Sequence, residues 1–380
     1  MSAALLAHCS SSPSQGGGAD AGTDVHFEPG ADGGHTAPDA GKGTIGSDAS
    51  SAKDTGTGGG TGTPFAVGTI CNSSGTKLTP PATVKHVIVI MEENENFGSV
   101  NGNAMAPYIS SLATDCGYAS NYADNTFAEN LVSNPHYLAL TSGSNCNTGV
   151  DESGTGCITT DGDASGQTLS TTSIFAQVSS WKAYEESMTG NCATSSSGSY
   201  ATKHNPPAYY STLSTCSADD VPIAALTCDS SSTMTPCGTP TGAFAEDLAN
   251  DTLAALSFVT PNLDNDMHNG TVTQGDNWLY TYMPLILTSK SYLAGEVVVL
   301  VLWDEQATVD FGGAVPNLFV SPYITAGTVV STQLNHFATL RAMEKALGIS
   351  TYLGCASGTI LGGGTCAAGS TADLRGAFNF

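Results

Sequence analysis

Two short segments of the chain are almost continuously apolar and rich in β-branched residues. They span Val84–Met91 and Val297–Trp303. Runs of this length and composition are typical of strands that are buried on both faces of a parallel sheet. Weaker strand patterns cover Ala255–Thr260 and Asn317–Val320. The hydrophobic pattern therefore predicts an α/β fold with a mostly parallel central sheet.

A helical pattern lies near the C-terminal end of the sequence. Four apolar residues recur there at the spacing of one helix face: Phe337, Leu340, Met343 and Leu347. Gly348 follows the last of them, and glycine in this position often ends a helix because it adopts positive φ without strain. We expect a helix over this segment that stops at Gly348.

Acidic residues directly follow the two strongest strand patterns. The first strand runs into Glu92, Glu93 and Asn94, and the second into Asp304 and Glu305. Ligands of open α/β sheets gather at the carboxyl ends of the strands, so we expect the two clusters to meet. Carboxylates held together repel one another unless a cation neutralises them, and their oxygens suit a hard divalent ion. The alternative is that the acids are solvated residues in the first turns of helices.

The N-terminal part of the sequence has a different composition. Met1–Cys9 ends in Leu-Ala-His-Cys and resembles the tail of a lipoprotein signal peptide, in which the cysteine is lipidated. Residues 10–63 consist mainly of Gly, Ser, Thr, Asp and Ala, which is typical of a disordered linker. We therefore predict a truncated signal or anchor at 1–9, a linker at 10–63 and a folded domain at 64–380. A disordered tail with one stray thiol is the alternative for the first segment.

Charge and hydropathy exclude several classes of protein. The 380 residues include 34 acidic and 10 basic side chains, which gives a net charge of −24. A nucleic-acid partner is not expected, because phosphate backbones require a basic surface. The charge also disfavours tight binding to anionic lipid surfaces. No apolar run approaches the roughly 18 residues of a membrane-spanning helix, so we expect no transmembrane segment.

The cysteine content indicates an oxidising compartment. The chain has 11 cysteines, and setting Cys9 apart leaves an even number that can form five disulfides. Three pairings would each close a short loop: Cys146 with Cys157, Cys228 with Cys237, and Cys355 with Cys366. We predict an extracytoplasmic protein, either secreted or a lipoprotein of the cell envelope.

Seven sequence segments together resemble a known family. They are Lys85–Phe97, Ser133–Gly143, Ser180–Met188, Lys203–Tyr210, Phe258–Gly270, Leu300–Glu305 and Asn335–Ile349. Their content and order are similar to those of the bacterial phosphoesterase family, which includes secreted acid phosphatases and non-zinc phospholipases C. The resemblance implies an alkaline-phosphatase-like fold, a three-layer α/β/α sandwich with a mostly parallel central sheet. It also implies that residues 64–380 form a phosphoesterase catalytic domain.

The resemblance implies a metal site. Its ligand positions correspond to Glu93, Asn94, Ser133, Asp304 and Glu305. One hard divalent ion, Ca²⁺, Mg²⁺ or Mn²⁺, would be bound there. Ser133 falls at the family's nucleophile, and coordination to a cation would activate a hydroxyl that is otherwise a weak nucleophile. Without the family resemblance, the local sequence is also compatible with Ser133 as a turn residue before Pro135.

The same resemblance implies further catalytic residues. His204, Asp266, His268 and His336 match polar positions that bind the phosphoryl group or relay protons. A histidine such as His268, held by Asp266, would protonate the leaving oxygen, and Lys203 could assist the phosphoryl group. Each histidine could instead be an ordinary core or capping residue.

Residues 131–137 depart from the family pattern around the nucleophile. The His-Pro that precedes the serine in the family is missing, and His136 replaces an asparagine. These two differences affect the positions that contact the leaving group and that influence the pH optimum in the family.

Three functions fit these observations. The first is a metal-dependent phosphomonoesterase, similar to acid phosphatases, that acts through a phosphoserine on Ser133. Its substrate would be a phosphate ester of a small molecule or a lipid head group. The alternatives are a phosphodiesterase of the phospholipase C type and a non-catalytic surface lipoprotein. The net charge of −24 favours the first over the second, since it disfavours contact with anionic membranes.

Overall fold

The computed structural model describes residues 65–66, 68–126, 132–145, 157–308, 313–360 and 365–380. The predicted anchor with Cys9 and the predicted linker at 10–63 lie outside these residues, as do Leu131 and Cys146. The predicted pair of Cys146 with Cys157 is therefore outside the described part as well.

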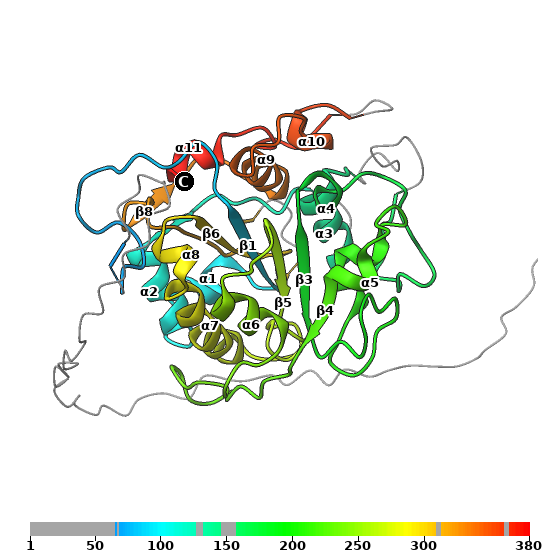
Figure 1. Ribbon diagram of the computed structural model, residues 1–380, viewed down its shortest axis with the longest axis horizontal. Helices are drawn as coiled ribbons and strands as arrows, with labels where there is room; N and C mark the ends of the chain where they lie inside the picture. Colours follow the sequence, from blue (N-terminus) through cyan, green and yellow to red (C-terminus); the bar gives the residue numbers. More distant parts are fainter. Residues whose placement is uncertain (1–64, 67, 127–131, 146–156, 309–312, 361–364) are drawn as a thin grey trace, which may run out of the picture. The chain divides into compact units, whose positions relative to one another are not determined.

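One eight-stranded sheet forms the centre of the domain (Figure 1). Its spatial order is β4-β3-β5-β1-β6-β7-β2-β8, and only β7 runs antiparallel to its neighbours. The strands are β1 (His86–Glu92), β2 (Gly117–Ala119), β3 (Trp181–Glu186), β4 (Asp220–Ile223), β5 (Leu256–Thr260), β6 (Val297–Trp303), β7 (Asn317–Val320) and β8 (Thr328–Val330). The predicted α/β class with a mostly parallel sheet is confirmed.

Helices cover both faces of the sheet and complete the predicted three-layer sandwich (Figure 1). One contacting group is α2 (Pro107–Asp115), α6 (Ala243–Asn250), α7 (Val272–Leu287) and α8 (Lys290–Leu293). The other is α3 (Ser133–Ser142), α9 (His336–Ala346), α10 (Gly354–Ser357) and α11 (Leu374–Phe378). Shorter helices are α1 (Phe97–Val100), α4 (Ile174–Gln177), α5 (Cys216–Asp219), η2 (Thr202–His204) and η3 (Pro206–Tyr209). None of the described helices is both long and apolar enough to cross a membrane.

The strongest sequence patterns form the centre of the sheet. β1 lies between β5 and β6, and every residue of β6 is buried. In α9, the Asn335 side chain accepts a hydrogen bond from the Ala338 N–H and caps the first turn. Gly348 follows the helix with φ of 77°, as its predicted role as a stop requires. All four strand predictions and the helix prediction are confirmed.

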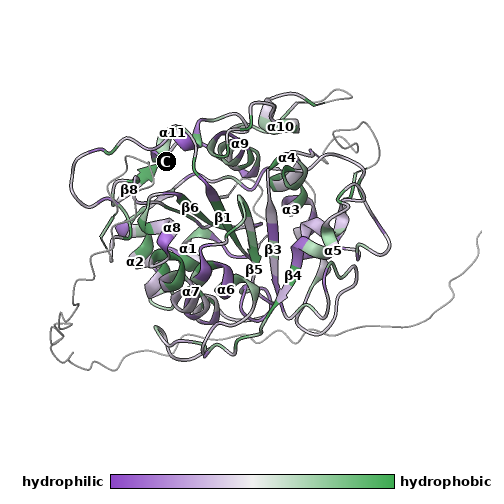
Figure 2. Cartoon of the chain, in the orientation of Figure 1, coloured by the Kyte–Doolittle hydropathy of each residue, from purple (hydrophilic) through white to green (hydrophobic). Residues whose placement is uncertain are grey.

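Four strands were not predicted: β2, β3, β4 and β8. β3 and β4 lie together at one end of the strand order. Figure 2 shows β3 and β4 in hydrophilic colours, in contrast to β6. β3 contains Lys182, Glu185 and Glu186, and β4 contains Asp220 and Pro222. These strands contribute Trp181, Tyr184 and Ile223 to the core, but they also carry charged side chains that have specific partners. The Lys182 Nζ, for example, lies 2.6 Å from Asp247 Oδ2 in α6.

Four disulfides join described cysteines. The predicted pairs Cys228–Cys237 and Cys355–Cys366 are confirmed. Cys71–Cys116 and Cys192–Cys216 link positions 45 and 24 residues apart. Spacing alone did not indicate these two, because longer loops leave many pairings open.

A buried carboxyl in α9 gives a test of the packing on this face. Burial raises the pKa of Glu344 from 4.5 to about 8, opposed by a hydrogen bond from the Leu353 N–H and by Arg341. The native state therefore binds this proton more tightly than the unfolded chain, and stability falls as pH rises through that interval. Because Glu344→Gln lacks this titration, we expect its free energy of unfolding to increase relative to that of the wild type as the pH rises from about 5 to about 9. The increase should be on the order of 2 to 4 kcal/mol.

Urea unfolding at several pH values measures this difference. Glu246→Gln, at an exposed position of α6, is the control and should follow the wild type throughout. Parallel stability curves for Glu344→Gln and the wild type would show that Glu344 does not titrate in this range.

Candidate active site

The ends of β1 and β6 bring the two acidic clusters together. Glu92 pairs with Trp303 in the sheet register, so the residues that follow emerge side by side. The Asn94 N–H donates a hydrogen bond of 3.1 Å to Asp304 Oδ1. Asn94 has φ of 41°, which turns the chain sharply after the strand, and asparagine tolerates this conformation better than most residues. The predicted meeting of the clusters is confirmed.

The carboxylates in this cluster are deeply buried. Glu93, Asp304 and Glu305 are each at most 1% exposed. Burial, followed by repulsion from Glu93, raises the pKa of Asp304 well above its usual range. Burial, followed by repulsion from Asp304 and Glu93, raises the pKa of Glu305 to about 11. Without a compensating positive charge, these groups would hold protons at neutral pH.

Ser133 is the first residue of α3 and points into this cluster. Its Oγ donates a hydrogen bond of 3.0 Å to Glu93 Oε2. Pro135 stands in the first turn, where its missing N–H has no partner to lose, so it is compatible with helix initiation at Ser133. Ser133 is thus held at a helix start, with its side chain fully buried. It is not merely a turn residue before Pro135.

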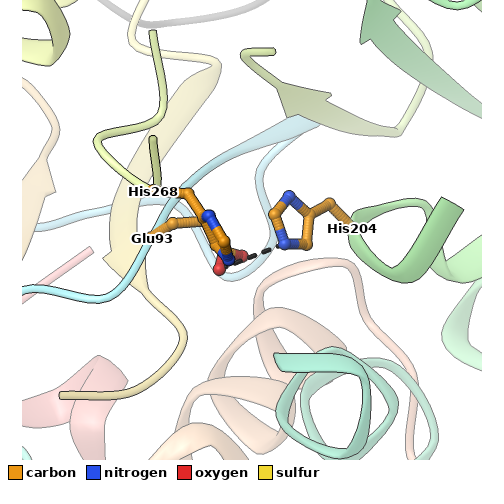
Figure 3. A group of neighbouring side chains, drawn as sticks. All are labelled: Glu93, His204 and His268. Carbon is orange, nitrogen blue, oxygen red and sulfur yellow. Dashed lines mark ion pairs between the residues drawn. The ribbon is translucent and has the colours of Figure 1, made fainter. Parts of the chain in front are cut away.

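His204 pairs with Glu93 (Figure 3) and also contacts a second carboxylate. Its Nε2 lies 3.1 Å from Glu93 Oε2 and its Nδ1 lies 3.2 Å from Asp266 Oδ2. The ring stacks on Tyr137, with 4° between their planes, and Tyr137 OH also donates to Glu93 Oε1. Burial raises the pKa of Asp266 to about 7, and the His204 partner opposes that rise.

His268 is held differently from the prediction. Asp266 Oδ1 accepts from the backbone N–H of His268 at 2.8 Å, not from its ring. The ring nitrogens lie 2.9 Å from Asn269 Oδ1 and 3.1 Å from Lys203 Nζ. Asp266 therefore orients the ring of His204 and holds His268 through its backbone N–H, so the predicted contact of Asp266 with His268 is made by the backbone and not by the imidazole ring. The sequence could not distinguish the two partners, because both histidines match the same family pattern.

His336 does not face the nucleophile. Its Nε2 lies 2.6 Å from the backbone carbonyl of Asp304, and its Nδ1 lies 3.1 Å from Tyr122 OH. Both ring nitrogens thus have partners within the protein, and the ring is fully buried. In this arrangement His336 supports the loop that carries Asp304, and direct binding of a phosphoryl group is not available to it.

Two neighbours of the site, Asp124 and Asp161, escaped the sequence reasoning, and they contact His136 and Lys203, respectively. Lys203 Nζ lies 3.4 Å from Ser133 Oγ and 3.1 Å from Asp161 Oδ2. His136 Nε2 lies 3.5 Å from Asp124 Oδ1 and 3.6 Å from Glu305 Oε2. Asp124 and Asp161 stand in polar loops without a distinctive pattern, so no local signal singled them out.

Lys203 stays cationic in this environment. Burial disfavours its charge, but Glu93 and Asp161 outweigh that effect and raise the pKa of the ammonium above its usual value. A positive charge therefore stands beside the Ser133 hydroxyl.

Two groups of side chains could bind a metal ion. The predicted set of Glu93, Asn94, Ser133, Asp304 and Glu305 lies together, and the buried Asp304 Oδ2 and Glu305 Oε2 have no hydrogen-bond partner among the residues that the structure describes. A cation would satisfy these oxygens, so the donor set fits a hard divalent ion. The Asn94 amide is compatible with either of two orientations, one with its nitrogen on Glu305 and one with it on Glu93.

The second group shares Glu93 with the first. Ligand atoms of Glu93, His204 and His268 lie within 4.8 Å of one another (Figure 3). Lys203 Nζ already contacts His268 in that group. A third cluster, Cys192, Cys216 and Asp220, is not a candidate because its two sulfurs form a disulfide.

Comparisons with known proteins show the family to which the chain belongs. A model described as the Phosphoesterase family matches residues 106–350. The chain belongs to the Phosphoesterase family. It is 28% identical to phosphatidylinositol-3-phosphatase of Mycobacterium tuberculosis over 270 residues, which are 70% of this chain and 78% of that protein. It is 26% identical to an acid phosphatase of Aspergillus fumigatus over 159 residues, 40% of this chain but only 31% of the fungal enzyme.

Among solved structures, a Vibrio parahaemolyticus protein in the alkaline phosphatase superfamily aligns with a TM-score of 0.43 and 13% identity. The alignment covers 76% of this chain and 72% of that one. Membership of the Phosphoesterase family and the phosphatase relatives make this phosphoesterase a hydrolase of phosphoric ester bonds.

The carboxylate cluster generates a prediction about metal binding. Asp304→Asn removes one of three buried carboxylate charges, so we expect the affinity for Mg²⁺ or Mn²⁺ to fall by about tenfold or more. Calorimetric titration of chelator-treated protein measures the change. Glu246→Gln also removes one negative charge but lies on the surface of α6, and it should bind the ion as the wild type does. Equal affinities for all three proteins would remove Asp304 from the ligand set.

Proposed function

We propose that this phosphoesterase is a metal-dependent phosphomonoesterase that uses Ser133 as its nucleophile. The observation that carries the proposal is the position of Ser133 Oγ, 3.0 Å from a buried carboxylate of the cluster and 3.4 Å from a lysine ammonium. A structural serine hydroxyl can be satisfied by neutral partners and does not require a carboxylate and an ammonium group beside it. Together they suit a group that must lose its proton and carry negative charge.

Glu93, Asn94, Ser133, Asp304 and Glu305 would bind the divalent ion. When bound, the ion supplies Lewis-acid activation of the serine hydroxyl and neutralises the carboxylates. The Ser133 Oγ proton, which is hydrogen-bonded to Glu93 Oε2 in the structure, passes to Glu93 before attack and returns to Oγ when the phosphoserine is hydrolysed. Lys203 then stabilises negative charge on Oγ and on the phosphoryl oxygens next to it.

The proposed reaction has two displacements. In the first, Ser133 Oγ forms a bond to phosphorus as the bond to the leaving oxygen breaks, and His268 supplies a proton to that oxygen. In the second, water attacks the phosphoserine, inorganic phosphate leaves, and Ser133 regains a proton. The chain Asp266–His204–Glu93 holds the Glu93 carboxylate in place beside Oγ throughout.

The substrate we propose is a phosphate monoester of a small molecule or a lipid head group. The mycobacterial relative is named for a phosphatidylinositol phosphate and the fungal relatives as acid phosphatases, which supports monoesters over diesters. We also propose an extracytoplasmic location, supported by the four disulfides among the described cysteines.

Hydrolysis of p-nitrophenyl phosphate tests metal dependence. We expect turnover that EDTA abolishes and that one of Ca²⁺, Mg²⁺ or Mn²⁺ restores, because the three carboxylates need a counter-charge to form the site. Turnover that is unaffected by EDTA would contradict the proposal. Hydrolysis of p-nitrophenyl phosphorylcholine in preference to the monoester would favour a phospholipase C-type diesterase. Absence of turnover on both in folded protein would favour a non-catalytic lipoprotein.

Substitution of Ser133 tests the nucleophile. Ser133→Ala removes the attacking atom, so we expect kcat to fall by about 10³-fold or more while the melting temperature changes little. Ser142→Ala is the matched control, since Ser142 is a buried serine of the same helix whose Oγ donates to Leu138 O and accepts from the Ser144 N–H. It should retain most activity. If Ser133→Ala kept more than a few per cent of wild-type kcat, the nucleophile would have to be another residue.

A further inference from the structure

A carboxylate lies where a phosphoryl group would be expected to bind. Asp161 Oδ1 accepts a hydrogen bond of 3.0 Å from the Asn134 N–H, in the first turn of α3. Its Oδ2 lies 3.1 Å from Lys203 Nζ. The two donors that Asp161 engages flank Ser133, since Asn134 is its neighbour in the chain and Lys203 Nζ is 3.4 Å from its Oγ.

The same two donors are the ones that a substrate needs. For attack by Ser133, phosphorus must come within about 3.5 Å of Oγ, which places the phosphoryl oxygens beside Asn134 N–H and Lys203 Nζ. A backbone N–H at a helix start and an ammonium are the usual partners of phosphate oxygens. In the structure, both donors instead contact the carboxylate of Asp161.

From this geometry, and on the basis of the proposed function, we infer that Asp161 is a specificity-determining residue that selects phosphoryl groups of low charge. If Asp161 stays in place, it repels an incoming phosphoryl group in proportion to that group's charge. If it is displaced, the substrate must first replace a charge-assisted contact with Lys203. With Asp161 in place, the repulsion weakens binding of a doubly charged monoester more than binding of a singly charged group. With Asp161 displaced, binding of every anion is weakened by the loss of the contact between Asp161 and Lys203.

The selected chemistry is the singly charged phosphoryl group. A monoester has one charge when its second acidic group is protonated, and a diester has one charge at any ordinary pH. Asp161 therefore reduces the advantage that Lys203 would otherwise give to dianions. Most of Asp161 is covered, with 28% of its side chain exposed, so solvent screens this repulsion only in part.

Binding of two simple anions tests the inference. Inorganic phosphate is mainly a dianion at about pH 8, whereas dimethyl phosphate has a single charge and two ester groups. Calorimetry on the full chain with Mg²⁺ present gives both dissociation constants. We expect Asp161→Asn to lower the constant for phosphate by about tenfold and that for dimethyl phosphate by about threefold, because the repulsion scales with ligand charge.

Asp163→Asn is the matched control. Asp163 lies on the same loop, but its Oδ1 accepts from Ser196 and not from the α3 start or Lys203. Both of its dissociation constants should equal those of the wild type. Asp161→Ser, checked by circular dichroism alongside Asp161→Asn, guards against a folding defect and should tighten phosphate binding in the same direction.

The remaining outcomes overturn the inference. Unchanged phosphate binding in Asp161→Asn, in a chain whose wild type hydrolyses p-nitrophenyl phosphate, would leave the proposed function standing and show that Asp161 only caps α3. Equal tightening for both anions would mean that Asp161 does not select by charge. If neither protein bound phosphate, the inference would fail whatever the turnover, while a lack of turnover would count separately against the proposed function.

Discussion

The mutual repulsion of three buried carboxylates is the constraint on which the site depends. Glu93, Asp304 and Glu305 emerge from adjacent parallel strands whose register brings them together, and no described lysine or arginine forms an ion pair with any of them. The sheet therefore holds together three carboxylates whose negative charges are not neutralised by ion pairs with described lysines or arginines. A hard cation resolves this conflict and at the same time activates the hydroxyl that lies among the carboxylates.

The nucleophile is positioned by contacts that converge on Glu93. Ser133 and Tyr137 approach this carboxylate from the first turns of α3, and His204 approaches it from η2. Asp266 then fixes the far side of the His204 ring. Because His204 of η2 contacts the Glu93 carboxylate and Asp266 of the loop after β5 contacts the His204 ring, residues more than 100 positions apart in the sequence are held together through Glu93. Lys203 adds the positive charge that this acidic cluster otherwise lacks.

The central part of the fold could be predicted from the sequence because it is stabilised by composition. β1, β6 and α9 bury continuous or periodic apolar residues, and their local pattern is sufficient. The acidic ends of β1 and β6 could be placed together from the topology of parallel sheets alone. β3 and β4 could not be recognised as strands from the sequence. Their Glu185 and Asp220 are buried, and burial of a carboxyl group in a strand can be explained only from the neighbouring strands.

The finer chemistry of the site depended on long-range contacts. Residue types and family pattern identified His204, His268 and His336 as a group, but only the fold distinguishes their partners. His336 supports the backbone of Asp304, and Asp266 contacts the ring of His204 but only the backbone N–H of His268. Asp161 gave no signal in the sequence, because its importance comes from lying next to the start of α3 and Lys203.

Acid-quench trapping of a phosphoenzyme tests the central claim most directly. The chain is mixed with p-nitrophenyl phosphate, quenched in acid during turnover, digested and mapped by mass spectrometry, with and without EDTA. The account predicts phosphate on the peptide that contains Ser133, and only when a divalent ion is present. Phosphate on another residue, or equal labelling of Ser133 in the presence of EDTA, would contradict it.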